Sequence, residues 1–145
     1  MSKVSIRPAT IHDAPALIRC VTAAYAPFVV AIPDLPDVSQ GVAEDIADHH
    51  VWVATANRTI VGGLILHITG TEAHLVNLAV DPDFSGMGIG RALITTAEDY
   101  SRAKGCVTLV LATHTLMPQN VRLYERLGWQ ISEMRGPKVC MIKSL

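Results

Sequence analysis

The spacing of apolar and polar residues divides the first fifty positions into a strand, a helix, a loop and a short helix. Apolar and polar residues alternate over Lys3–Arg7, which predicts an edge strand. Apolar residues at helical spacing predict a helix from Ile11 to about Ala26, and Pro27 is expected to close it because proline disfavours a helix interior. Prolines and aspartates over Ala31–Gln40 predict a surface loop, and a short helix is expected over Ser39–Ala47.

The apolar pattern changes to a period of two at Val51, which is typical of β-strands. The runs Val51–Ala56 and Thr59–Ile68 predict a β-hairpin that turns at Asn57-Arg58. The pair Gly62-Gly63 within the second strand indicates a bulge. A further apolar run predicts a strand over Ala73–Val80.

The rest of the chain alternates between helices and strands. Apolar residues on one face predict a helix from Gly88 to about Lys104, which Gly105 ends as a C-terminal cap. The nearly continuous apolar run Cys106–Ala112 is typical of a strand covered on both faces. A helix and a closing strand pair are then expected over Pro118–Leu127, Trp129–Met134 and Val139–Lys143.

In the order β-α-α-β-β-β-α-β-α-β-β, these elements predict an α/β (mixed α+β) fold. We expect one mixed central sheet of about seven strands with about four helices packed on it. The strand–helix–strand unit from Ala73 to Ala112 is expected to be a right-handed parallel crossover. A chain of 145 residues is the size of one domain, so residues 1–145 are expected to form a single one.

Composition excludes several classes of protein. Half of the residues are hydrophobic and 17% are charged, which favours a packed core over disorder. A net charge of −1, with no run of Lys or Arg, argues against a nucleic-acid-binding module. The charged N-terminus does not resemble a signal peptide, and no run is long and apolar enough to span a membrane, so a cytoplasmic protein is expected. Three cysteines without CxxC spacing are expected to be buried thiols.

The most informative segment is Asp81–Leu93, where three alternating glycines connect a strand to a helix. A glycine-rich turn at a helix N-terminus presents backbone N–H groups and the positive end of the helix dipole, which together bind phosphate. A nucleotide P-loop would need Lys-Ser/Thr after Gly90, where Arg91-Ala92 stands. A dinucleotide-binding fold would need glycine at position 91. The pattern therefore predicts a phosphorylated ligand of another kind.

Two motifs, in order, resemble the GCN5-related N-acetyltransferase (GNAT) superfamily. The glycine segment Ser85–Gly90 aligns with the family's pyrophosphate loop, Gln/Arg-x-x-Gly-x-Gly/Ala. The stretch Asn120–Trp129 resembles its second signature, which has an asparagine, a tyrosine and then Gly-Phe. The opening Ile6–Ala9 is also similar. The resemblance covers essentially the whole chain and implies acetyl-CoA as co-substrate, with no metal.

The chain departs from the family's pattern at two positions. Ser85 stands where the family has Gln or Arg, so a longer polar side chain is missing from the loop. The backbone N–H groups that hold a diphosphate are still present. Val76 occupies the register in which some members carry a catalytic carboxylate.

The resemblance implies a role for the strand before the loop and for the loop itself. The backbone N–H of Leu78 would polarise the thioester carbonyl, and Val80 would pair with the pantetheine arm. Such a preorganised donor contributes a few kcal/mol to catalysis. The diphosphate would be bound by the loop and first helical turn, comprising Ser85, Gly86, Met87, Gly88, Ile89, Gly90 and Arg91.

The second signature supplies a candidate general acid. A phenol is protonated at neutral pH, so Tyr124 would donate a proton to the departing thiolate. The alternative is that Tyr124 only packs at a helix–sheet junction. Asn120, one turn earlier, would hydrogen-bond the pantetheine amides, or would simply begin the helix.

The general base is left open by the sequence. His114 follows the strand Cys106–Ala112 and titrates in a suitable range, but it is equally suited to bond the loop backbone. Glu72 and His74 are alternatives that would act through water. His49-His50 is interpreted as a solvated turn, since no carboxylate clearly joins the pair to form a metal site.

These residues favour an acetyl-CoA-dependent N-acetyltransferase that acts by direct transfer to a primary amine in a ternary complex. No cysteine lies in either motif to carry the acetyl group. The alternatives are a non-catalytic acyl-CoA-binding sensor and, less favoured, a nucleotide-binding regulatory domain. The acceptor, a small molecule or a protein amine, cannot be identified from the sequence. Asp34 and Asp37 either attract a cationic acceptor or, as the composition slightly favours, form part of a solvated acidic loop. A homodimer is left open.

Overall fold

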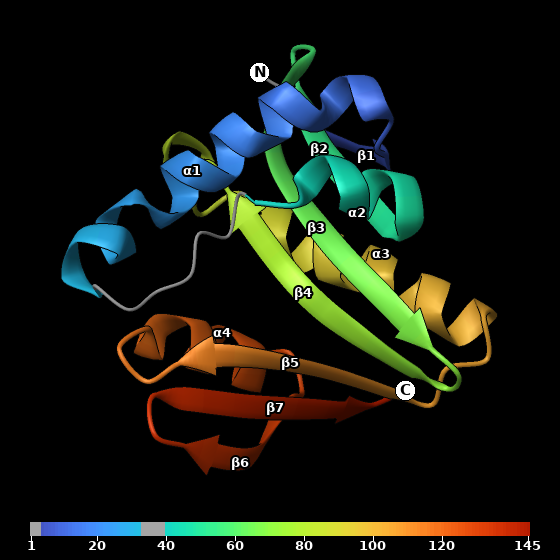
Figure 1. Ribbon diagram of the computed structural model, residues 1–145, viewed down its shortest axis with the longest axis vertical. Coiled ribbons are helices and arrows are strands. Elements are labelled where there is room, and N and C mark those ends of the chain that lie inside the picture. The colour runs from blue at the N-terminus through green and yellow to red at the C-terminus, as the bar shows by residue number, and fades with distance from the viewer. Residues whose placement is uncertain (1–3, 33–39) are drawn as a thin grey trace.

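Seven strands join into one mixed sheet with helices on both faces in the computed structural model, which describes residues 4–32 and 40–145 (Figure 1). The N-terminal half contains β1 (Val4–Pro8), a 3₁₀ turn (Ile11–Asp13), α1 (Ala14–Ala31), α2 (Val42–Asp48), β2 (His50–Ala56), β3 (Thr59–Thr69) and β4 (Glu72–Val80). The C-terminal half contains a 3₁₀ turn (Pro82–Phe84), α3 (Ile89–Ala103), β5 (Thr108–His114), α4 (Pro118–Arg126), β6 (Gln130–Arg135) and β7 (Lys138–Ser144). The expected fold class and order of elements are confirmed.

The strands are arranged in the order β1-β2-β3-β4-β5-β7-β6. All neighbours are antiparallel except β4 and β5, which are parallel, as the crossover through α3 predicts. This parallel pairing covers only three residue pairs, from Glu72↔Thr108 to His74↔Val110. Beyond it the two strands diverge, which Figure 1 shows as a widening angle between β4 and β5.

A β-bulge lies where β4 leaves β5. The β3–β4 register passes from Ile65↔Asn77 to Leu66↔Leu75, so Val76 is an extra residue on β4. Bulges bend the strand that carries them and increase its twist. Because this one follows the last β4–β5 pair by two residues, it turns β4 away from β5.

The two faces of the sheet pack against different helices. One core joins the sheet to α3 and α4 through residues such as Leu93 and Tyr124, and the other joins it to α1 and α2 through Leu17 and Val42. The pair Gly62-Gly63 permits this close packing. A Cβ at Gly62 would lie 2.9 Å from Ile89 of α3, and one at Gly63 would lie 2.4 Å from Leu17 Cδ1 of α1.

The expected bulge in the hairpin is present one residue earlier. Ala54 pairs with Gly62 and Thr55 with Ile60, which leaves Val61 as the extra residue. The turn itself is formed by Asn57 and Arg58, both with positive φ, as predicted.

Three local predictions were wrong. Pro27 does not end the first helix but lies inside α1, which continues to Ala31; the absent N–H removes one helical bond without stopping the packed helix. Strand β5 runs over Thr108–His114, two residues later than expected at both ends. Only one of its faces is fully buried, through Leu109 and Leu111, while Ala112 is exposed.

An ion pair between a partly buried lysine and a buried glutamate connects the C-terminal strand to two helices. Lys143 Nζ on β7 donates to both carboxylate oxygens of Glu98 on α3, at 3.0 and 2.8 Å. The same ammonium donates to the carbonyl oxygen of Leu127, just after α4, at 2.7 Å. Removing one partner of such a pair typically costs several kcal/mol because a charge is left buried.

Within the described residues, no helix has the length and apolar character needed to cross a membrane.

The glycine pair generates a stability prediction. Gly63→Ala is expected to destabilise the fold by about 1–3 kcal/mol, because the new methyl overlaps a Leu17 side chain that is itself buried. The matched control is Gly90→Ala in α3, where a Cβ would meet ordinary contacts of 3.7 Å or more. That variant should be neutral or gain up to about 1 kcal/mol. Urea denaturation measures both, and equal stability of the two variants would contradict the packing interpretation.

Candidate functional site

The glycine segment forms a loop between β4 and α3. Asp81 caps the 3₁₀ turn by accepting from the N–H of Asp83 at 2.9 Å. Gly86 and Gly88 then have φ of 79° and 76°, a left-handed conformation that favours glycine, and Gly88 is the N-cap of α3. A Cβ at either position would meet open space, so these glycines are required by backbone conformation and not by crowding.

The start of α3 presents unpaired backbone donors. The first intrahelical bond runs from Ala92 to Gly88, so the N–H groups of Ile89, Gly90 and Arg91 have no helical acceptor. No side chain within the described residues caps this helix end. The helix dipole adds positive potential at the same place. The predicted loop therefore has the geometry that suits an anion.

The register of β4 determines where its backbone groups point. Asp81 N–H bonds to Val61 O, and Val80 and Leu78 lie opposite Gly62 and Leu64. In an antiparallel ladder, residues alternate between bonding to the neighbour and pointing away from it. The N–H groups of Leu78 and Val80 are therefore directed away from β3, toward the side where β5 has diverged.

Two polar residues that sequence reasoning missed lie beside Leu78. Asn77 is buried within β4, and its Oδ1 accepts from the hydroxyl of Tyr25 on α1 at 3.3 Å. The same hydroxyl lies 3.4 Å from the carbonyl oxygen of Leu78. An amide inside the apolar run HLVNLAV was the available signal for Asn77. Tyr25 carried no such signal, because a tyrosine on the apolar face of a helix is indistinguishable from a core residue.

Tyr124 is buried on α4, next to the ring of Trp129 at 5.5 Å between centroids. Burial raises the pKa of Tyr124 far above its usual value, and the nearby Tyr25 phenol adds to the rise. Burial also raises the pKa of Tyr25. Both phenols therefore keep their protons through the neutral range, as a proton donor must. Asn120 lies on the same face, one turn before Tyr124.

The candidate bases are not brought together with Leu78. Nδ1 of His114 accepts from the backbone N–H of Leu116 at 3.0 Å, which occupies the lone pair there and favours the loop-bonding role. His74 and Glu72 lie at the opposite end of β4 from the loop. His74 is four residues before Leu78, a separation of about 13 Å along a strand.

The other sequence candidates have varied environments. Asp34 and Asp37 lie outside the described residues. His49 is exposed, but it stacks on His67 and is accompanied by Asp45, which corrects the interpretation of His49-His50 as a solvated turn. The cysteines are mostly buried, as expected: Cys20 and Cys106 fully, Cys140 in part.

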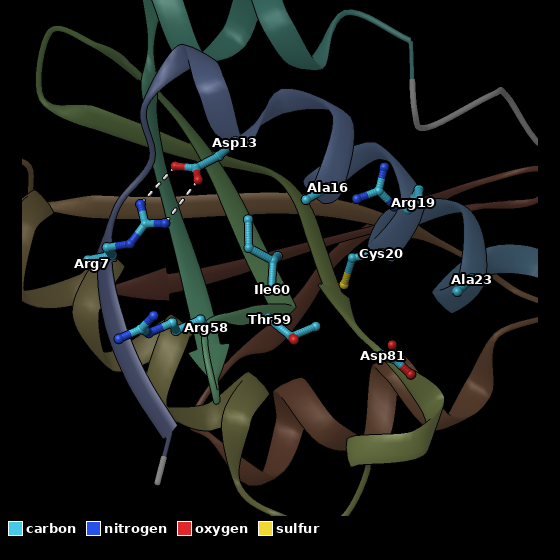
Figure 2. Close-up of a pocket in the computed structure, with 10 residues that line it drawn as sticks. All are labelled: Arg7, Asp13, Ala16, Arg19, Cys20, Ala23, Arg58, Thr59, Ile60 and Asp81. Carbon is cyan, nitrogen blue, oxygen red and sulfur yellow. Dashed lines mark hydrogen bonds and ion pairs between the residues drawn. The ribbon is translucent and has the colours of Figure 1, made fainter. Parts of the chain in front are cut away.

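A separate pocket of about 530 Å³ lies between α1, β1 and the β2–β3 turn (Figure 2). It contains three arginines, of which Arg7 is bound by Asp13 at 2.8 and 2.9 Å. None of the predicted site residues lines it, although Asp81 at its edge directly precedes the glycine loop. Burial, together with the nearby charge of Asp81, raises the pKa of the Cys20 thiol in this pocket to about 11.

Comparison with known proteins finds a family match over most of the chain. The model of the acetyltransferase (GNAT) family matches residues 19–129. An alanine N-acetyltransferase of ribosomal protein bS18 from Salmonella typhimurium is 36% identical over 81 residues, which cover 56% of this chain and 55% of that protein. The uncharacterized N-acetyltransferase YjgM of Escherichia coli is 29% identical over 137 residues, 86% of this chain and 81% of its own.

Solved structures share the whole architecture. The PaiA N-acetyltransferase of Thermoplasma acidophilum, crystallised with coenzyme A, has a TM-score of 0.87 at 22% identity over 99% of both chains. The ribosomal-protein-S18-alanine N-acetyltransferase of Escherichia coli has a TM-score of 0.81 at 25% identity, over 99% of this chain and 93% of that one. In sequence, by contrast, the chain spans about half the length of the bS18-modifying relatives.

The Arg7–Asp13 pair generates a pH prediction. The hydrogen bond from Arg7 lowers the pKa of the Asp13 carboxyl to about 2, from an unperturbed value of about 3.9. A depressed carboxyl pKa stabilises the fold above pH 4, and this contribution is lost as the pH falls toward 2. Asp13→Asn should therefore lower Tm at pH 7, and the difference from wild type should shrink between pH 4 and 2.

The control for this prediction is Asp99→Asn, which removes an exposed pair with Arg102 at 3.3 Å. Exposed pairs contribute little, so its Tm should match wild type throughout. Thermal denaturation followed by circular dichroism measures both variants. Equal Tm values for the two variants at pH 7 would show that the Arg7–Asp13 pair stabilises the fold no more than an exposed pair does.

Proposed function

The chain belongs to the acetyltransferase (GNAT) family, and on that premise we propose that it transfers the acetyl group of acetyl-CoA to a primary amine. One observation carries the proposal: the unpaired N–H groups at the start of α3 lie next to the stretch of β4 that no longer pairs with β5. The first feature suits a diphosphate and the second suits an acylated pantetheine arm. Coenzyme A contains both groups in one molecule, so the two features together suit it.

The residues present fit that ligand. The N–H groups of Ile89, Gly90 and Arg91 would bind the diphosphate, and the glycines at 86 and 88 leave open space around the turn. Ser85 contributes its backbone in place of the family's longer side chain. The N–H of Val80, directed away from β3, would pair with an amide of the pantetheine arm.

Acetyl-CoA supplies a thioester whose carbonyl carbon a neutral amine can attack. The N–H of Leu78 would donate to the carbonyl oxygen and stabilise the negative charge that develops there. As the carbon–sulfur bond breaks, Tyr124 would give its proton to the departing sulfur, and the proton that the amine nitrogen loses on forming the amide would restore the phenol. Asn77 and Tyr25 would hold the strand at Leu78 in position.

Direct transfer is favoured over an acyl-cysteine intermediate. A cysteine acts as a nucleophile through its thiolate, and the raised pKa of Cys20 suppresses that form. Cys106 is buried beneath the start of β5, away from the loop. Transfer from the thioester directly to the amine, with both substrates bound, requires neither residue. Nothing in the comparisons favours the non-catalytic sensor.

The acceptor that we propose is the α-amine of a polypeptide with an N-terminal alanine. Proteins 35–36% identical to this chain over 81 residues are named as alanine N-acetyltransferases of ribosomal protein bS18. The same activity is named for a solved structure that superposes on 99% of this chain. The α-amine has a pKa of about 7.7–8.0, so an appreciable fraction is neutral at pH 7 without a strong base. This is consistent with the position of Glu72 and His74 at the far end of β4 and with the bond that occupies Nδ1 of His114.

Ligand binding provides the first test. Acetyl-CoA at a hundred times its Kd should stabilise the fold by about 2.7 kcal/mol, and ATP at the same concentration should not. Differential scanning fluorimetry measures both shifts in Tm. Stabilisation by ATP alone would point to a nucleotide-binding domain and would overturn the proposal.

Catalysis provides the second test. Tyr124→Phe is expected to lower kcat by about 10²–10⁴-fold, because it removes the proton donor, with little change in the KM for acetyl-CoA. The readout is acetylation of a peptide with N-terminal alanine, followed by free thiol release and by mass spectrometry. The same peptide with a blocked N-terminus and an internal lysine serves as the acceptor control.

Tyr100→Phe is the matched control variant. Tyr100 lies near the C-terminal end of α3, far from the glycine loop, and its hydroxyl lies 3.0 Å from Nδ1 of His50 on β2. Its turnover should equal that of wild type. Unchanged turnover in Tyr124→Phe would remove Tyr124 as the acid. Acetylation of the blocked peptide at lysine would replace the α-amine with a side-chain amine as the acceptor.

A further inference from the structure

Three side chains with metal-binding atoms converge where α2 meets β3. They are Asp45, His49 and His67, and one ligand atom from each lies within 4.8 Å of the other two. Asp45 Oδ1 and His67 Nε2 are 3.0 Å apart, and the rings of His49 and His67 stack at 3.5 Å between centroids with an interplanar angle of 19°. Two imidazoles and one carboxylate thus share a single small region.

The backbone places these groups together without strain in the loop. Asp45 and His49 are four residues apart, and the N–H of His49 bonds the carbonyl oxygen of Asp45 at 2.8 Å as the last turn of α2 closes. Residues four apart lie on the same side of a helix. His67 lies on β3 two residues after Ile65 and four after Gly63, on the face that packs against α1 and α2.

We propose that this cluster binds one divalent transition-metal ion, with Zn²⁺ as the best match. Two neutral imidazole nitrogens and one carboxylate oxygen form a common ligand set for zinc, with water in the fourth position. Mg²⁺ and Ca²⁺ prefer sets made of oxygen alone. The ion would take the place of the proton that Asp45 and His67 share in their hydrogen bond.

The geometry needs little adjustment. Zinc bonds of 2.0–2.2 Å at tetrahedral angles place ligand atoms about 3.3 Å apart. Asp45 and His67 are already close to that separation. The ligand atom of His49 lies within 4.8 Å of the other two, so a movement of at most about 1.5 Å of its exposed side chain reaches that separation.

The site is distinct from the proposed acetyl-transfer site. His67 lies near the end of β3, opposite His74 on β4, whereas the glycine loop follows the other end of β4. The ion would tie α2 to β3 and so fix the chain segment that leads into β2. The proposal stands independently of the acetyltransferase assignment, because it requires no coenzyme and no acceptor.

The test is metal binding to the full chain, free of any histidine tag. Isothermal titration with Zn²⁺ should show one ion per chain, and Zn²⁺ should raise Tm. Co²⁺ should give the visible absorption of a tetrahedral site. His67→Gln and Asp45→Asn should each weaken Zn²⁺ binding by at least about tenfold, since even indirect ligand partners contribute that much.

The matched control is His50→Gln. His50 follows His49 directly, but its Nδ1 lies 3.0 Å from the hydroxyl of Tyr100 on α3, on the opposite face of the sheet. This variant should bind Zn²⁺ as wild type does. No binding by the wild-type chain would overturn the proposal, as would equal affinity in His67→Gln or equal weakening in His50→Gln. Circular dichroism of the metal-free variants establishes that each is folded.

Discussion

The early end of the pairing between β4 and β5 is the feature on which the candidate site depends. Three residue pairs join the two parallel strands, and the bulge at Val76 then bends β4 away. Backbone donors of β4 that a continuous sheet would have paired with β5 are thereby left available to the proposed ligand. The hydroxyl of Tyr25 on α1 lies 3.4 Å from the carbonyl oxygen of Leu78 in this diverging stretch.

The position of the anion-binding loop follows from how closely the helices approach the sheet. Gly62 and Gly63 are adjacent on β3 and face opposite ways, so α3 and α1 both pack against the bare backbone of one strand. Ile89, the first residue of α3, is among the contacts at Gly62. The start of α3, with its unpaired N–H groups, is therefore held against the strand next to Leu78 and Val80. Gly62 and Gly63 therefore determine both the packing of the core and the position of the proposed binding loop.

The sequence was sufficient wherever the structure is determined locally. The glycine loop, the Asn120–Tyr124 turn and the hairpin at Asn57 depend on neighbouring residues, and their conformations agree with the prediction. Interactions between distant segments were missed. The Tyr25–Asn77 bond joins residues 52 positions apart, and the histidine pair was judged by adjacency when His49 in fact associates with His67. The prediction that Pro27 ends the helix was wrong for the same reason. Packing against the sheet stabilises α1 beyond a residue that weakens a helix locally.

The contacts of Lys143 connect the last strand to both halves of the proposed machinery. Its ammonium holds Glu98 on the helix that begins at the anion-binding loop, and Leu127 at the end of the helix that carries Tyr124. One cation near the C-terminus thus connects the helix that begins at the proposed phosphate-binding loop with the end of the helix that carries the proposed proton donor. The final strand therefore contributes to the relative position of these two helices, although none of its residues is proposed to touch a substrate.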